Sequence, residues 1–413
     1  MITAEHIDKA AERLSEVVVL TPLQYNVQLS EEFGCQVYLK REDLQLVRSY
    51  KLRGAYNKIS SLHAEEQLRG VVCASAGNHA QGVAYACQKL NIQGTIFMPV
   101  TTPSQKVNQV RLFGKDKVNV ILTGDTFDDA QVQAVQYGKL HKACFVHPFD
   151  DEKVIEGQGT VAQEIVDDAK FRIDYLLVPV GGGGLAAGVS TYFSARSPHT
   201  KIIGIEPEGA ASMQVSMSNG CNTELQQIDK FVDGAAVKRV GDLTFDICNK
   251  LLSQMVLVPE GKVCTTILQL YNQQAIVVEP AGALTVAALG LLKEQLKGKN
   301  VVCVLSGSNN DILRTAEIKE RSLQYEGLKH YFVIRFPQRA GALKEFVGSV
   351  LGPGDDIVHF EYMKKNNREN GPALIGIELK EPHDLPPLRE RLAELGFQYE
   401  YLNGNDNLLQ FLI

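Results

Sequence analysis

The sequence predicts an α/β protein with parallel sheets covered by helices, followed by a smaller α+β unit. Between residues 37 and 304, short apolar runs rich in β-branched residues alternate with longer amphipathic stretches, as in parallel sheets that are buried on both faces. After residue 321 the segments shorten and follow the order βαββαβ. We therefore expect a large part at about 1–322, a compact unit at 329–403 and a tail at 404–413.

Short apolar runs are the expected strands of the larger part, and they lie at 71–74, 94–98, 118–122, 175–180, 201–205 and 301–305. The smaller unit is expected to contain strand 331–336, helix 341–351, strands 356–363 and 373–379, helix 388–395 and strand 398–402, with a turn at 366–372. Ligands of open parallel sheets bind at the carboxyl ends of the strands, so residues that follow these runs are candidates for a site.

Composition argues against several classes of partner. The 413 residues carry a formal net charge of −6 without a Lys/Arg-rich block, so nothing favours binding to nucleic acid. The longest apolar stretch, around 275–292, contains Glu279, Pro280 and two glycines, so no membrane span is expected. The N-terminus carries acidic residues where a signal peptide carries basic ones, which predicts a cytoplasmic protein. The eight cysteines include no Cys-x-x-Cys pair, and no metal site is expected.

The run Ser49–Ala55 draws attention to Lys51 because other suggestive stretches follow it in a consistent order. A lysine taken alone is usually a solvated surface residue. Its significance therefore depends on the motifs downstream.

A run of four glycines, Gly181, Gly182, Gly183 and Gly184, precedes Leu185 where an expected strand meets a helix. Such a loop presents backbone N–H groups to a phosphate at the helix N-terminus. A tight packing turn is the simpler alternative. A dinucleotide site is a further alternative, because a strand that ends in Glu206 follows the glycines.

Two other strand ends carry polar residues. Ser75, Ala76, Gly77, Asn78 and His79 open a helix and offer N–H donors to a carboxylate, although Ser75 or Asn78 alternatively caps that helix. We expect His79 to be a core or helix-surface histidine in preference to a base.

Ser306 follows the expected strand 301–305. Its hydroxyl is a candidate either to face a ring nitrogen or to cap a helix. A lysine, a phosphate loop, a carboxylate loop and a hydroxyl at a strand end together match the needs of pyridoxal 5'-phosphate.

With these motifs, the chain resembles the fold type II (tryptophan synthase β-like) pyridoxal-phosphate enzymes, and among them the biosynthetic threonine dehydratases. The stretches Thr21–Leu23, Leu39–Gln45 and Val278–Ala283 add to the resemblance, which covers nearly the whole chain. It implies a catalytic domain with a smaller subdomain at about 52–148, and an ACT-like regulatory domain at 329–403.

The resemblance also implies the roles of the site residues. Lys51 holds the cofactor and removes the α-proton of the substrate, Gly181 to Leu185 bind the phosphate, and Asn78 bonds the 3-hydroxyl. Ser306 faces the pyridine nitrogen, and the loop from Ser75 to His79 holds the substrate carboxylate.

We expect the reaction to convert L-threonine, with L-serine as a poorer substrate, to 2-oxobutanoate and ammonia. This is the first step toward isoleucine, and feedback inhibition by isoleucine and a homotetramer are implied as well. Serine racemases have a serine where this chain has Ala76, so racemisation is not expected. Their cation site has an aspartate at the position of Ser212 in this chain, so that metal site is not expected either. A catabolic serine/threonine dehydratase, a nicotinamide-dependent dehydrogenase and a non-catalytic amino-acid-binding regulator are the competing functions.

Overall fold

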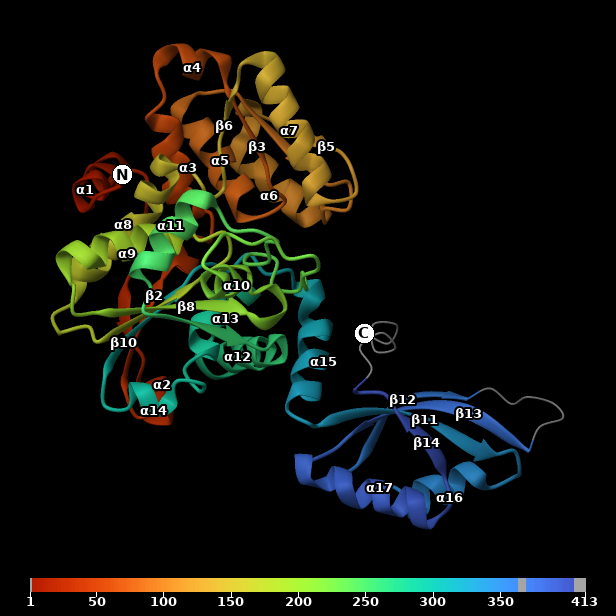
Figure 1. Cartoon of the computed structure of the whole chain (residues 1–413). Helices are drawn as coiled ribbons and strands as arrows, with labels where there is room; N and C mark the ends of the chain where they lie inside the picture. Colours follow the sequence, from red (N-terminus) through yellow and green to blue (C-terminus); the bar gives the residue numbers. More distant parts are fainter. Residues whose placement is uncertain (1, 363–368, 405–413) are drawn as a thin grey trace. The chain divides into compact units, whose positions relative to one another are not determined.

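The computed structural model describes residues 2–362 and 369–404, and these form two compact units, residues 1–311 and 312–413. The first unit contains two sheets, and the second contains one (Figure 1). The expected turn at 366–372 and the tail at 404–413 lie largely outside the described residues.

The larger sheet of the first unit has the strand order β1-β2-β10-β7-β8-β9. Its strands are β1 (Leu23–Tyr25), β2 (Gln36–Arg41), β7 (Tyr175–Pro179), β8 (Lys201–Pro207), β9 (Gln254–Val258) and β10 (Asn300–Leu305). All neighbours are parallel except β1 and β2. Their carboxyl ends therefore share one edge, where Gly181 follows β7 and Ser306 follows β10.

Helices cover both faces of this sheet. They are α1 (Ala4–Leu14), α2 (Val27–Phe33), α8 (Glu152–Asp168), α9 (Gly184–Arg196), α10 (Ser212–Asn219), α11 (Asp242–Leu251), α12 (Glu260–Gln274), α13 (Pro280–Ala287) and α14 (Lys293–Leu296). Figure 1 shows α8, α9 and α11 on one face and α12 and α13 on the other. The core under α8 and α9 joins Val178 and Val302 of the strands to Ile155 and Phe193 of the helices, and such continuous burial explains the uninterrupted apolar runs.

The smaller sheet is fully parallel, with the order β5-β4-β3-β6. It contains β3 (Val71–Ala74), β4 (Gly94–Met98), β5 (Val118–Leu122) and β6 (Cys144–Phe145). The helices around it are α3 (Lys51–Ser60), α4 (Ala64–Arg69), α5 (Asn78–Leu90), α6 (Ser104–Gly114) and α7 (Phe127–His141) (Figure 1). This segment is inserted in the sequence between β2 and β7 of the larger sheet, and its helices α3 and α5 begin at the site described below.

The second unit begins with α15 (Thr315–Tyr325) and has an antiparallel sheet of order β12-β13-β11-β14. Its elements are β11 (Lys329–Pro337), α16 (Ala342–Ser349), β12 (Asp356–Tyr362), β13 (Asn370–Glu378), α17 (Leu385–Glu394) and β14 (Gln398–Tyr401). The predicted order βαββαβ, and with it the fold class, is confirmed.

Two boundaries in this unit differ from the expectation. Gly371 and Pro372 were expected in a turn but lie in β13, because β13 pairs with β11 as far as Asn370↔Pro337. Helix α17 starts before Pro386 and Pro387, since its first turn tolerates residues that lack an N–H donor. Periodicity alone places the helix start after the two prolines.

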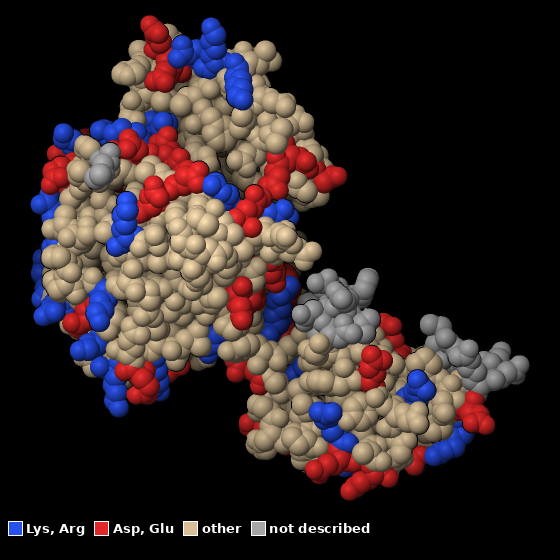
Figure 2. Space-filling model, in the orientation of Figure 1, with Lys and Arg blue, Asp and Glu red and all other residues tan. Residues whose placement is uncertain are grey.

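On the face shown in Figure 2, Lys and Arg side chains are interspersed with Asp and Glu. Within the residues that the structure describes, no helix is both long and apolar enough to cross a membrane.

Candidate active site

The lysine loop and the end of β10 are joined by backbone contacts. Ser49 and Gly307 form an isolated antiparallel bridge, and the N–H of Tyr50 donates to the carbonyl of Ser306 at 3.2 Å. Ser306 itself is buried. The structure thus places Lys51 beside the strand end that was expected to carry the ring-facing hydroxyl.

Lys51 is the first residue of α3 and is partly buried. Its Nζ donates to the carbonyl oxygen of Pro148 at 2.9 Å. Burial lowers the pKa of Lys51 to about 8, and the nearby Glu279 carboxylate opposes that shift. Roughly a tenth of the amine is therefore neutral at pH 7, far more than for an ordinary lysine, and the neutral form is the one that a nucleophile or base requires.

The glycine loop runs from β7 into α9 and packs tightly against the segment that follows the smaller sheet. A Cβ on Gly182 would lie 2.2 Å from the ring of Phe149, and one on Gly184 would lie 2.4 Å from Oε1 of Gln158. Gly183 has a φ of +91°, which other residues rarely adopt. The loop ends at the N-terminus of the thirteen-residue helix α9, where backbone N–H groups favour an anion. The side chain of Leu185 packs into the core.

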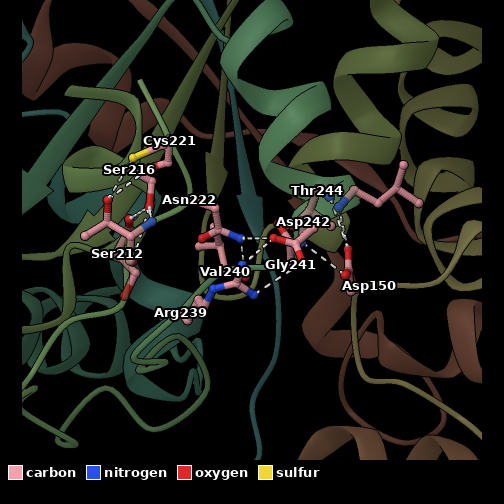
Figure 3. A network of polar contacts seen from close by, with 12 residues as sticks. Asp150, Ser212, Ser216, Cys221, Asn222, Arg239, Val240, Gly241, Asp242 and Thr244 are labelled. Atoms are coloured by element: carbon pink, nitrogen blue, oxygen red, sulfur yellow. Dashed lines mark hydrogen bonds and ion pairs between the residues drawn. The ribbon is translucent and has the colours of Figure 1, made fainter. Parts of the chain in front are cut away.

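Asp150, the residue after Phe149, binds the start of α11, which in turn contacts the glycine loop (Figure 3). Asp150 accepts hydrogen bonds from the N–H groups of Asp242, Leu243 and Thr244 at 3.0–3.2 Å, at the start of α11. The hydroxyl of Thr244 in turn donates to the carbonyl of Gly182 at 2.7 Å. Sequence reasoning missed Asp150. The available signal was the start of α11, which has no capping side chain of its own.

The loop between β3 and α5 carries the expected carboxylate-binding residues. Its helix is capped by Gly77 without a side-chain bond, so neither Ser75 nor Asn78 acts as the cap. The Ser75 hydroxyl instead accepts from the N–H of Gly77 at 3.2 Å. A Cβ on Gly77 would meet nothing within 4 Å, which leaves space for a ligand beside Ala76 and Gly77.

Asn78 lies between two polar partners from distant parts of the chain. Its Nδ2 donates to Oε1 of Glu279 at 2.6 Å, and its Oδ1 accepts from Nδ2 of Asn309 at 2.6 Å. Glu279 was expected only as part of a motif, and no role was assigned to it. Nothing local in the sequence indicates a contact across 201 positions.

His79 is a buried histidine, as expected for a core residue. Its Nε2 contacts the carbonyl of Val146 at 2.9 Å. Burial lowers the pKa of His79 to about 3, and the charge of Lys51 adds to the effect. The ring is therefore neutral at physiological pH and able to contact a ligand only as a neutral donor or acceptor.

Several buried polar atoms around Lys51 have no hydrogen-bond partner among the described residues. They are Ser49 Oγ, His79 Nδ1, Gln158 Oε1 and Asn310 Oδ1. Such atoms are rare in a finished protein interior. Together with the amine of Lys51 and the backbone N–H groups of the glycine loop, they fit a polar group that carries a phosphate, such as pyridoxal phosphate.

The dinucleotide alternative fits poorly. Glu206, its ribose-binding acid, is fully buried and accepts from the N–H groups of Met213 and Gln214 at 2.7 and 2.9 Å. Burial also raises the pKa of Glu206 to about 8. Both oxygens of this carboxyl accept hydrogen bonds from the first turn of α10. Among residues 2–362 and 369–404, no group of three or more His, Cys, Asp or Glu is arranged to hold a metal ion.

Comparisons with known proteins agree with this site. Residues 14–307 match the family of pyridoxal-phosphate dependent enzymes, and residues 320–412 match the C-terminal regulatory domain of threonine dehydratase. The chain is 61% identical over its whole length to a biosynthetic L-threonine dehydratase of Halalkalibacterium halodurans, covering 99% of that protein. Identity to the Bacillus subtilis protein of the same name is 57%, over 100% of this chain and 98% of that one.

Solved structures also resemble the chain. The processed form of threonine deaminase isoform 2 from Solanum lycopersicum is 42% identical with a TM-score of 0.73, over 77% of this chain and 92% of that one. Serine racemase from Dictyostelium discoideum is 31% identical with a TM-score of 0.70, over 75% and 99% of the two chains. The chain therefore belongs to the pyridoxal-phosphate dependent enzymes, in the family of the biosynthetic L-threonine dehydratases.

Proposed function

We propose that this chain catalyses the dehydration of L-threonine to 2-oxobutanoate and ammonia, with pyridoxal phosphate as cofactor and L-serine as a poorer substrate. The observation that carries the proposal is the joint presence of a partly buried, low-pKa lysine beside the glycine loop and a regulatory domain of the threonine dehydratase kind. The full-length similarity to biosynthetic enzymes supports the same reaction.

When bound, pyridoxal phosphate supplies an electron-withdrawing ring that stabilises negative charge at the α-carbon of an amino acid. Lys51 is the residue that would hold it and then move the α-proton, since burial keeps its amine partly neutral. The N–H groups of Gly181 to Leu185 would hold the phosphate. The loop from Ser75 to His79 would hold the substrate carboxylate.

Ser306 would favour elimination over transamination if its hydroxyl faces the ring nitrogen of the bound cofactor. A neutral hydroxyl does not force that nitrogen to be protonated, whereas a carboxylate does, so the ring would be a weaker electron sink. Loss of the β-hydroxyl as water would then be favoured over return of the proton to the α-carbon. Hydrolysis of the released enamine, through its imine, would give the oxo acid and ammonia.

Feedback regulation belongs to the βαββαβ unit at 329–403, and its proposed effector is isoleucine. An open depression of about 580 Å³ on the exposed face of this unit's sheet supports a site for a zwitterionic amino acid. It is lined by Arg335 and Glu400, which carry opposite charges, and by the apolar Val333 and Pro372. We further propose a cytoplasmic homotetramer, by analogy with the family.

The direct test is turnover by the purified protein. L-Threonine, L-serine and D-serine are each incubated with it, and oxo acid, ammonia and the other enantiomer are measured. We expect rapid 2-oxobutanoate formation, slower pyruvate formation and negligible racemisation, because Ala76 supplies no hydroxyl on the second face. Racemisation faster than elimination would contradict the proposal.

A further inference from the structure

Glu279 is a buried acid that none of the roles above includes. It precedes α13 as the N-cap residue, yet its side chain makes no capping bond to that helix. It is 5% exposed, and its Oε1 accepts from Nδ2 of Asn78 at 2.6 Å. The acid therefore serves the site, not its own helix.

The carboxylate of Glu279 has little freedom to move. The backbone N–H of Glu279 donates to the carbonyl of Gly307 at 3.1 Å. A Cβ on Gly307 would lie 2.5 Å from Oε1 of Glu279, and one on Gly234 would lie 3.5 Å from the same atom. The two glycines thus bound a narrow space that fixes the acceptor oxygen.

Asn309 constrains the other end of the Asn78 amide. Its Nδ2 donates to Oδ1 of Asn78 at 2.6 Å and to the carbonyl of Val47 at 2.9 Å. If the Asn78 amide were reversed, its oxygen would meet the Glu279 carboxylate and its NH₂ would meet the NH₂ of Asn309. Both contacts are repulsive, so the orientation is set by the partners.

One N–H of Asn78 remains after these two bonds, because the amide nitrogen has two hydrogens and Glu279 takes one. We propose that Glu279, together with Asn309, is a positioning residue that makes Asn78 offer an N–H, and not its carbonyl, to the 3-hydroxyl oxygen of pyridoxal phosphate. This inference rests on the proposed role of Asn78.

Several charged groups act on Glu279. Lys51 of α3 and Asp233 of the loop before Gly234 act on it electrostatically, as does Lys106 of α6, which pairs with Asp233 at 2.5 Å. Burial, aided by Asp233, raises the pKa of Glu279 to about 7, while the bond from Asn78 opposes the shift. The hold on Asn78 is stronger above this pH, where the acceptor is ionised.

The test uses the full-length protein with Glu279→Ala and Glu279→Gln, measured on both sides of pH 7. Glu260→Gln is the matched control, since Glu260 is also a partly buried acid that accepts from a backbone N–H, that of Gly209. The readouts are the dissociation constant of pyridoxal phosphate from the cofactor-free protein, the visible absorbance maximum of the loaded protein, and circular dichroism for folding.

We expect Glu279→Ala to weaken cofactor binding about tenfold, which corresponds to the loss of one charge-assisted hydrogen bond, and to move the visible maximum. Glu279→Gln keeps an acceptor for Asn78, so binding is expected to stay within about threefold of wild type, with its pH dependence around 7 removed. Glu260→Gln should resemble wild type.

Wild-type affinity and an unchanged visible maximum in Glu279→Ala overturn the inference, and so does a Gln variant that is as impaired as the Ala variant. If Glu279→Ala does not fold, Asn309→Ala replaces it, and an unchanged visible maximum there overturns the inference as well. None of these readouts uses threonine. A wild-type protein that fails to dehydrate threonine while these results hold removes the proposed function and leaves this inference standing.

Discussion

Nζ of Lys51 donates a 2.9 Å hydrogen bond to the carbonyl oxygen of Pro148. This contact joins the start of α3 to the segment that leads from the smaller sheet into α8. The next residue, Phe149, packs on Gly182 of the glycine loop. The amine and the proposed phosphate site are therefore held by one continuous segment, and variants of that segment should affect both.

Replacing Lys51 by alanine should remove the covalent anchor of the cofactor. We expect the visible absorbance to disappear after dialysis, and threonine turnover to fall at least about a thousandfold, as for the loss of a residue that acts as base and anchor. Lys58→Ala is the control, because Lys58 lies on the same helix and pairs with Asp151. A variant that keeps the visible band after dialysis would show that the anchor is another residue.

Arg53, two residues after Lys51, should matter for stability. Its fully buried guanidinium bonds Glu42 at 2.8 Å and Glu164 at 2.6 Å. Arg53→Ala leaves the buried Glu42 without its cationic partner and leaves Glu164 with Lys40 alone, so we expect a loss of about 3–5 kcal/mol in the free energy of unfolding, measured with denaturant. Arg196→Ala removes an exposed pair with Asp8 and should change the free energy of unfolding little, because solvent screens such pairs. Equal losses in the two variants would refute this reading.

Asp150 should support cofactor binding indirectly, because it binds the start of α11 and α11 contacts the glycine loop. Asp150→Ala leaves three N–H groups at the start of α11 without their acceptor. We expect cofactor affinity to fall about tenfold and unfolding free energy by about 2 kcal/mol, as for a lost hydrogen-bonded charge. Asp128→Asn, at an exposed and long ion pair with Lys238, is the control. Unchanged affinity in Asp150→Ala would mean that the glycine loop holds its shape alone.

Stability of the cofactor-free protein should depend on pH through Glu279. Burial raises its pKa from 4.5 to about 7, so between these values the folded state keeps a proton that the unfolded state has released. Its contribution is present below pH 4.5 and is lost as pH rises toward 7. Relative to Glu279→Gln, the wild type should lose on the order of 2–3 kcal/mol over this window. Parallel stability curves for the two proteins in denaturant titrations would contradict the assignment.

Arg335 should set the sensitivity to isoleucine. If its guanidinium binds the effector carboxylate, Arg335→Ala should raise the half-inhibiting isoleucine concentration about tenfold and leave the kinetics without isoleucine unchanged. Lys344, an exposed cation on α16, is replaced by alanine as the control. An inhibition curve that does not move in Arg335→Ala places the effector elsewhere on the unit.

Much of this fold follows from local sequence. The runs at 71–74 and 94–98 coincide with β3 and β4, because strands buried on both faces are continuously apolar. The run at 118–122 coincides with β5, an edge strand that is only partly buried but keeps four apolar residues out of five. Other edge strands were harder. The short β6 pairs through two residues, and β9 is only partly buried, so neither produces a strong pattern.

The candidate site was predictable to the extent that its residues follow strands. Lys51 and Asn78 begin helices α3 and α5, Ser306 follows β10, and each stands in a stretch of recognisable composition. The structure brings these stretches together. The contacts of Glu279 and Asp150 could not be predicted from local sequence. Glu279 binds Asn78, which is 201 positions away, and Asp150 binds the start of α11, which is 92–94 positions away. Only the packing of α3, α5 and α11 around the sheets determines those distances.

The initial rate of 2-oxobutanoate formation from L-threonine, measured across an isoleucine titration with L-serine as the comparison substrate, tests both the reaction and its regulation. We expect turnover that is faster with threonine and that falls as isoleucine rises, with a coupling between the two sites of about 1–3 kcal/mol. Turnover that isoleucine does not change would contradict the regulatory part, and no turnover of either substrate would contradict the proposed reaction.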